Sequence, residues 1–125
     1  MFAEGYAAKA RLFAKGRMRP GQMNRTEKAY AVYLESERQA GRVTAFWFEA
    51  MKLKIAEGAC FYSPDFMVLR PDGLIELHEV KGSPKIFQED AKVKVKSCAT
   101  QYPFPVRVVY PRTKKSGGGW DVQEF

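Results

Sequence analysis

A few acidic and basic side chains in the middle of the chain have types and spacing that suit catalysis. Asp65 begins one apolar run, Glu79 and Lys81 end the next, and an Asp72-Gly73 turn separates the two runs. Alternate side chains of a strand share a face, so Glu79 and Lys81 are expected to point the same way. Pairing about the turn brings Asp65 within reach of Glu79.

These residue types suit the binding of a metal ion against a phosphate. The carboxylates of Asp65 and Glu79 and the backbone carbonyl of Val80 offer oxygen ligands, and Mg²⁺ prefers oxygen-rich sites that keep several waters. A cation held there would polarise a phosphoryl oxygen and lower the pKa of a bound water. Lys81 would lie beside that water and offset charge developing on the phosphorus. Glu27, in the first turn of an expected helix, is the best third acid and a further candidate metal ligand.

Each of these residues also has an ordinary structural explanation. Asp65 follows a proline and suits a turn, while Glu79 and Lys81 suit an exposed ion pair of small energetic value. Glu27 suits a capping box at the start of a helix. The context favours a site, because both halves of the pattern lie on adjacent expected strands, a helix follows, and the chain is basic.

The rest of the pattern predicts one α/β domain. A chain of 125 residues fits a single domain, and 46% hydrophobic residues suffice for a core. Residues 24–40 predict a helix, with Asn24 as N-cap and Gly41 as its end. Apolar runs over 46–48, 51–55, 61–69 and 74–81 predict three or four antiparallel strands in a meander.

The C-terminal part predicts a helix and two strands. Ser83-Pro84 is typical of a helix start, and the apolar residues of 84–101 have helical spacing. Lysines and valines alternate over 92–96, so a strand there is the alternative. The continuous apolar run over residues 106–110 predicts a buried strand. The next residues are expected to form a basic loop over 112–119 and an edge strand over 120–125. The expected fold is a mixed β-sheet, an antiparallel meander plus a further strand, flanked by helices.

The charge of the chain favours a polyanionic partner. The net charge is +7, which indicates nucleic acid first and an anionic membrane surface second, with a generically basic protein as the alternative. Two separate cysteines and one histidine argue against a Cys/His zinc site and suit an intracellular protein. No apolar stretch approaches the length of a membrane span.

Candidate phosphate-binding residues are scattered along the chain. Residues 1–23 form a basic N-terminal arm with the spacing of an amphipathic helix, ahead of a domain over 24–125. Neutralising phosphates with basic side chains gives affinity without reading sequence. The candidates are Arg17, Arg19, Arg25, Lys85, Lys92, Lys96, Arg112, Lys114 and Lys115.

The motif residues resemble the PD-(D/E)XK nuclease superfamily. The resemblance rests on Pro64-Asp65 and Glu79-Val80-Lys81 and extends over roughly residues 24–110. Within that superfamily, the chain resembles small phage-encoded members in the order of its helix, aromatic strand and motif. These members are the Holliday-junction resolvases of the phage endonuclease I type. The fold implied by this resemblance is a restriction-endonuclease-like core.

The resemblance also implies an activity and roles for the motif residues. The activity is Mg²⁺- or Mn²⁺-dependent hydrolysis of DNA phosphodiesters that leaves 5′-phosphate and 3′-hydroxyl ends. Asp65 and Glu79 would be metal ligands, Lys81 the catalytic lysine and Glu27 the helix acid. A resolvase makes two opposed cuts in a four-way junction, so a homodimer is expected, in the cytoplasm of a bacterial host.

Two alternatives remain open from the sequence. One is a nuclease of other preference, such as a nickase or a restriction-like enzyme. The other is a non-catalytic DNA-binding module on the same fold, which the intact set of two acids and a lysine disfavours.

Overall fold

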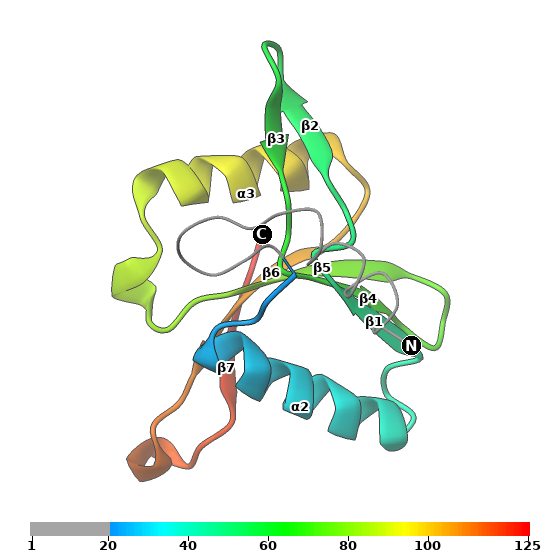
Figure 1. Ribbon diagram of the computed structural model, residues 1–125, viewed down its shortest axis with the longest axis vertical. Coiled ribbons are helices and arrows are strands. Elements are labelled where there is room, and N and C mark those ends of the chain that lie inside the picture. Colours follow the sequence, from blue (N-terminus) through cyan, green and yellow to red (C-terminus); the bar gives the residue numbers. More distant parts are fainter. Residues whose placement is uncertain (1–20) are drawn as a thin grey trace.

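The structure is a computed structural model that describes residues 21–125. A five-stranded sheet in the order β1-β4-β5-β6-β7 forms its centre, and β2 and β3 form a separate two-stranded sheet (Figure 1). The strands are β1 (Ala45–Phe48), β2 (Leu53–Ala56), β3 (Cys60–Tyr62), β4 (Phe66–Leu69), β5 (Ile75–Val80), β6 (Val106–Pro111) and β7 (Trp120–Glu124). The helices are α2 (Arg25–Gln39) and α3 (Glu89–Gln101), with short 3₁₀ turns at Pro84–Ile86 and Lys114–Ser116.

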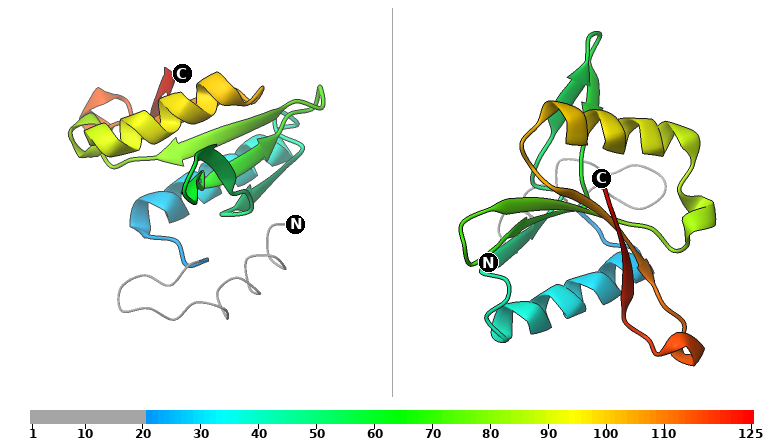
Figure 2. Two further views of the ribbon diagram at one scale, coloured as in Figure 1. Left: turned by 90° about the horizontal axis from the view of Figure 1, so that it is seen from above. Right: turned by 180° about the vertical axis from the view of Figure 1, so that it is seen from behind.

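The two helices cover opposite faces of the central sheet (Figure 2). Helix α2 lies on one face, and α3 with the β2–β3 hairpin lies on the other. Strands β5 and β6 are parallel, while the other neighbours in the sheet are antiparallel. The expected mixed sheet with flanking helices is therefore confirmed.

Helix α2 begins where its capping residues predict. The side chain of Asn24 accepts a hydrogen bond from the backbone N–H of Glu27, and the Glu27 carboxylate accepts one from the backbone N–H of Asn24. This reciprocal pair satisfies two N–H groups that the first turn would otherwise leave unpaired. Gly41, with φ of +83°, follows the C-cap and ends the helix.

The hairpin of β4 and β5 fixes the register of the candidate site. Phe66 pairs with His78 and Leu69 with Ile75, around the turn at Asp72-Gly73. Extending the ladder by one residue sets Asp65 opposite Glu79, as the sequence predicts. All of β5 beyond Ile75 is buried, because both of its faces are covered by other elements.

The expected meander is wrong in its middle. Strand β1 pairs with β4 rather than with β2, and the run over 61–69 divides into β3 and β4, which belong to different sheets. Pro64 lies at that division and lacks the N–H that a continuous ladder needs. The β2–β3 hairpin thus leaves the central sheet and contacts α3 instead.

The expected helix over 84–101 is partly wrong, and the alternative strand over 92–96 is wrong. A 3₁₀ turn occupies Pro84–Ile86, Phe87 is buried outside any helix, and α3 begins only at Glu89. Ser83 is the N-cap of the 3₁₀ turn, without a side-chain capping bond. Strand β6 and the edge strand β7 lie where the sequence predicts them.

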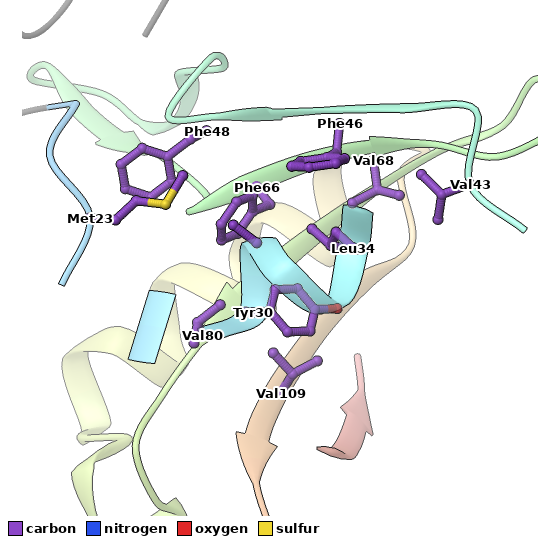
Figure 3. Close-up of a cluster of buried hydrophobic side chains, with 11 residues drawn as sticks. Met23, Tyr30, Leu34, Val43, Phe46, Phe48, Phe66, Val68, Val80 and Val109 are labelled. Atoms are coloured by element: carbon purple, nitrogen blue, oxygen red, sulfur yellow. The ribbon is translucent and has the colours of Figure 1, made fainter. Parts of the chain in front are cut away.

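Two hydrophobic clusters hold the layers together. The first packs α2 against the sheet, with Tyr30 and Leu34 meeting Phe66 and Val109 (Figure 3). Met23 belongs to this cluster, so the ordered domain includes residues ahead of the helix cap. The second cluster, around Leu77, Val95, Cys98, Val106 and Val108, packs α3 on the opposite face. Residues 1–20 of the expected arm over 1–23 lie outside the described residues.

Among residues 21–125, the structure contains no helix with the length and apolar character needed to cross a bilayer.

Candidate active site

Asp65 is held at the point where β4 begins. Its Oδ2 accepts a hydrogen bond of 2.8 Å from the backbone N–H of Val80, the last residue of β5. Burial raises the pKa of the Asp65 carboxyl well above its ordinary value, and the nearby carboxylates of Glu79 and Glu27 raise it further. The fold therefore holds Asp65 where its charged form is disfavoured, so that this carboxyl either keeps its proton or needs a cation beside it.

Glu79 and Lys81 share a face of the chain beside Asp65. The Glu79 Oε2 and Lys81 Nζ atoms are 3.2 Å apart, and the Glu79 side chain is only 11% exposed. Glu79 Oε1 accepts a hydrogen bond of 2.8 Å from the hydroxyl of Tyr62, the last residue of β3. Tyr62 therefore fixes the orientation of the Glu79 carboxylate, which the sequence alone did not indicate.

Glu27 serves both as capping acid and as a member of the site. Its carboxyl lies close enough to that of Asp65 for each to affect the pKa of the other. Burial raises the pKa of Glu27, and the charges of Glu49 and Glu79 add to the effect, against the hydrogen bonds from Asn24 and Asp65 that lower it. The expected third acid is thus brought to Asp65 by the start of α2.

Glu49 is a fourth acid that sequence reasoning missed. It follows β1 directly, and its backbone N–H donates to the carbonyl of Asp65 at 2.8 Å. Its φ of +50° lies in the left-handed region, which costs a non-glycine residue about 1–3 kcal/mol and is concentrated at functional sites. The pairing of β1 with β4 carries Glu49 to the site, and that pairing was not predicted.

The oxygen atoms of the candidate site are of the kind that bind a hard divalent cation. Asp65 and Glu79 provide carboxylate oxygens, and the N–H and C=O of one strand residue point the same way, so the Val80 carbonyl faces the side of Asp65. Crowded carboxylates with a raised pKa are relieved by a bound cation. No three His, Cys, Asp or Glu side chains among residues 21–125 are already gathered as a metal site. Two carboxylates, a carbonyl and waters therefore form the candidate shell.

A cleft adjoins Glu79 on the α3 face of the sheet. Its volume is about 300 Å³, and its lining includes Phe61, Tyr62, Glu79, Ala91 and Lys94. Lys94 was missed as a candidate, because helical spacing puts it on a different side of α3 from Lys92 and Lys96.

The expected phosphate-binding residues do not form one surface. Arg25 begins α2, and Lys85, Lys92 and Lys96 belong to the segment around α3. Arg112, Lys114 and Lys115 lie beyond β6, at the tip that leads to β7, and the guanidinium of Arg112 pairs with Asp121 at 2.6 Å. Arg17 and Arg19 lie outside the described residues.

His78 points away from the candidate site, as strand alternation predicts. Its Nδ1 lies 2.6 Å from the hydroxyl of Tyr30, and its Nε2 lies 2.9 Å from the carboxylate of Glu76, on the α2 face of the sheet. His78 is therefore not placed to act as a base for Glu79 or Lys81.

In comparisons with known proteins, the chain matches no family model, no curated protein and no solved structure.

Proposed function

We propose that this protein is a metal-dependent DNA endonuclease of the PD-(D/E)XK type with a restriction-endonuclease-like core. The observation that carries the proposal is the meeting of Asp65, Glu79, Lys81 and Glu27 at one edge of the sheet, beside a cleft. Placing Asp65 and Glu27, whose pKa values are raised, beside the ion pair of Glu79 and Lys81 is costly for stability, and such arrangements are concentrated at functional sites. A net charge of +7 supports a polyanionic substrate.

Each side chain of the candidate site would have its own role in phosphodiester hydrolysis. Asp65, oriented by the Val80 N–H, and Glu79, oriented by the Tyr62 hydroxyl, would hold Mg²⁺ or Mn²⁺ together with the Val80 carbonyl. A cation held there supplies charge neutralisation and a lowered pKa for the attacking water. Lys81, anchored on Glu79, has N–H donors left for a phosphate oxygen and offsets the negative charge of the transition state. Glu27, whose carboxyl lies beside that of Asp65, is the candidate third acid of the site.

We further propose a branched substrate, a four-way junction, and a homodimer that makes two opposed cuts. The test compares a labelled four-way junction, a linear duplex and a single strand of the same sequence, with Mg²⁺ or with EDTA. We expect Mg²⁺-dependent paired nicks in the junction with 5′-phosphate ends, and no cleavage in EDTA. Glu79→Gln, which keeps the size of the side chain, is the inactive control.

Other outcomes would change the proposal in defined ways. Equal cleavage of linear duplex would keep the nuclease and remove the junction specificity. Tight binding with no cleavage of any substrate by wild type would leave a non-catalytic DNA-binding module. A monomer in sedimentation at micromolar concentration, with and without junction DNA, would contradict the homodimer.

DNA binding should depend steeply on salt, and Lys94 should contribute to that dependence. Each phosphate contact releases about one counterion, so log affinity falls linearly with log salt concentration. Because Lys94 lines the cleft, we expect Lys94→Ala to reduce the slope by roughly 1 and to weaken binding to all sequences alike. Fluorescence anisotropy over a salt series measures the slope. Lys54→Ala, on the exposed β2 strand, is the control, and an identical slope for both variants would contradict a contact at Lys94.

A further inference from the structure

A second pocket lies under α2, on the opposite face of the sheet from Glu79 and Lys81. Its volume is about 350 Å³, within the range of about 300–1,000 Å³ that small-molecule sites occupy. Strand β5 contributes Glu76 and His78 to its floor, while helix α2 and edge strand β7 supply the walls. The proposed nuclease function uses none of these residues.

The floor of the pocket is a buried, hydrogen-bonded network. The Glu76 carboxylate accepts, so His78 Nε2–H donates to it at 2.9 Å, and the Tyr30 hydroxyl lies 2.6 Å from His78 Nδ1. Arg70 Nη1 lies 3.1 Å from the other Glu76 oxygen. The hydrogen bond from His78 is the main cause that lowers the pKa of Glu76, and it outweighs the opposing effect of burial on this side chain, which is only 4% exposed. Residues fixed in this way make a rigid, preformed floor.

Arg107 on β6 has a buried donor that no residue among 21–125 accepts. Its Nη2 pairs with Glu124 at 2.9 Å and lies 3.5 Å from Glu76. Its Nε–H is buried and, among the side chains that the structure describes, is the polar atom with no hydrogen-bond partner. A buried guanidinium donor without an acceptor is unfavourable, and a ligand oxygen or ring nitrogen would satisfy it after a small shift of the side chain.

Aromatic rings form the wall above this floor. The ring centroids of Tyr33 and Trp120 are 6.4 Å apart, and Tyr30 meets Trp120 edge-on at 4.9 Å. Tyr33 is 38% exposed, so its ring faces the pocket and solvent rather than the core. The three arginines that line the pocket are each paired with a carboxylate: Arg42 with Glu37, Arg70 with Asp72 and Glu76, and Arg107 with Glu124. The rings and the unpaired Nε–H of Arg107 together favour a flat ligand with acceptor atoms.

We propose that this pocket binds a nucleotide, with the base against Tyr33 and Trp120 and an acceptor of the base or phosphate on Arg107. A planar base matches the aromatic wall, and its ring nitrogens or a phosphate oxygen match the unpaired donor of Arg107. The nucleotide is either free or an unpaired residue of a DNA strand. Because the pocket lies on the α2 face, binding does not require the candidate active site to function.

The test uses a Trp47→Phe protein, in which Trp120 is the remaining tryptophan. Quenching of its fluorescence is titrated with dGMP, with dAMP, with a short single-stranded oligonucleotide and with ribose 5-phosphate, and calorimetry gives the affinity. We expect nucleotides to bind and the sugar phosphate not to bind. Tyr33→Ala and Arg107→Gln should each weaken binding about tenfold or more. Binding of the oligonucleotide alone would assign the ligand as a base of a strand.

Matched controls separate this pocket from the candidate active site. Arg38→Gln alters another arginine that pairs with a carboxylate, that of Glu35 on α2, outside the pocket, and should bind as wild type does. Tyr33→Ala changes a half-exposed ring, so it tests the proposal even if Arg107→Gln does not fold. The proposal fails if no nucleotide or oligonucleotide binds at millimolar concentration, or if ribose 5-phosphate binds equally well. Loss of binding in Lys81→Ala but not in Tyr33→Ala would also overturn it.

Discussion

Replacing Lys81 by alanine is expected to abolish DNA cleavage while leaving DNA binding nearly unchanged. The Lys81 ammonium lies 3.2 Å from Glu79 and is the cation that the fold fixes beside the two acids. Loss of one preorganised group that stabilises transition-state charge costs about 10²–10³ in rate. We expect single-turnover cleavage of a labelled junction to fall by at least that factor. A single lysine contributes only one phosphate contact to binding, so the affinity should change little.

An exposed lysine nearby serves as the matched control for Lys81. Lys85 lies in the 3₁₀ turn that follows the motif, and its side chain is exposed. Lys85→Ala removes the same charge from the same segment and should cleave at a rate close to wild type. If Lys81→Ala and Lys85→Ala lost activity equally, general attraction of DNA rather than catalysis would be the role of Lys81. Thermal unfolding of both variants checks that the fold is intact.

Replacing Asp65 by asparagine is expected to remove cleavage and to stabilise the folded protein at neutral pH. The asparagine side-chain oxygen still accepts the Val80 N–H, and the change removes one charge from a crowded, partly buried group of acids. Charged groups at functional sites commonly lower the stability of the fold, and removing such a repulsion raises the free energy of unfolding by about 0.5–2 kcal/mol. Chemical unfolding at pH 7 measures the gain in the free energy of unfolding.

The pH dependence of stability follows from the same raised pKa. The pKa of Asp65 is higher in the folded protein than the value of about 3.9 for an unfolded chain. The folded state therefore binds the proton more tightly, and its contribution to stability is complete below about pH 4 and is lost as pH rises through the folded pKa. Glu27, whose pKa is also raised by burial, acts in the same direction. Wild type should lose stability relative to Asp65→Asn between pH 4 and the folded pKa.

Added metal and a second substitution control this prediction. Mg²⁺ should raise the melting temperature of wild type more than that of Asp65→Asn, because binding to the folded state stabilises it. Asp90→Asn, an exposed acid in the first turn of α3, should gain no stability, since a negative charge there is favourable. A less stable Asp65→Asn protein at pH 7 would show that the Asp65 charge is satisfied within the folded chain and would contradict the prediction.

Local chemistry in the sequence was sufficient for the central hairpin and for α2. Asp72-Gly73 fixed the turn, and the two-residue period of the strand then determined that Asp65 opposes Glu79 and that His78 faces away. The reciprocal bonds of Asn24 and Glu27 set the start of α2. Each of these features depends on residues close together in the chain, where spacing alone determines geometry.

Long-range pairing decided the rest of the site. Strand β1 pairs with β4 across the inserted β2–β3 hairpin, and this pairing brings Glu49 to Asp65. The break at Pro64 turns β3 out of the central sheet, and only then does Tyr62 reach Glu79. The local periodicity of the sequence does not determine which strands become neighbours, because the burial and the ladder hydrogen bonds that pair them involve segments far apart in the chain. The motif acids were therefore visible in the sequence, while the residues that orient and surround them depended on the tertiary structure.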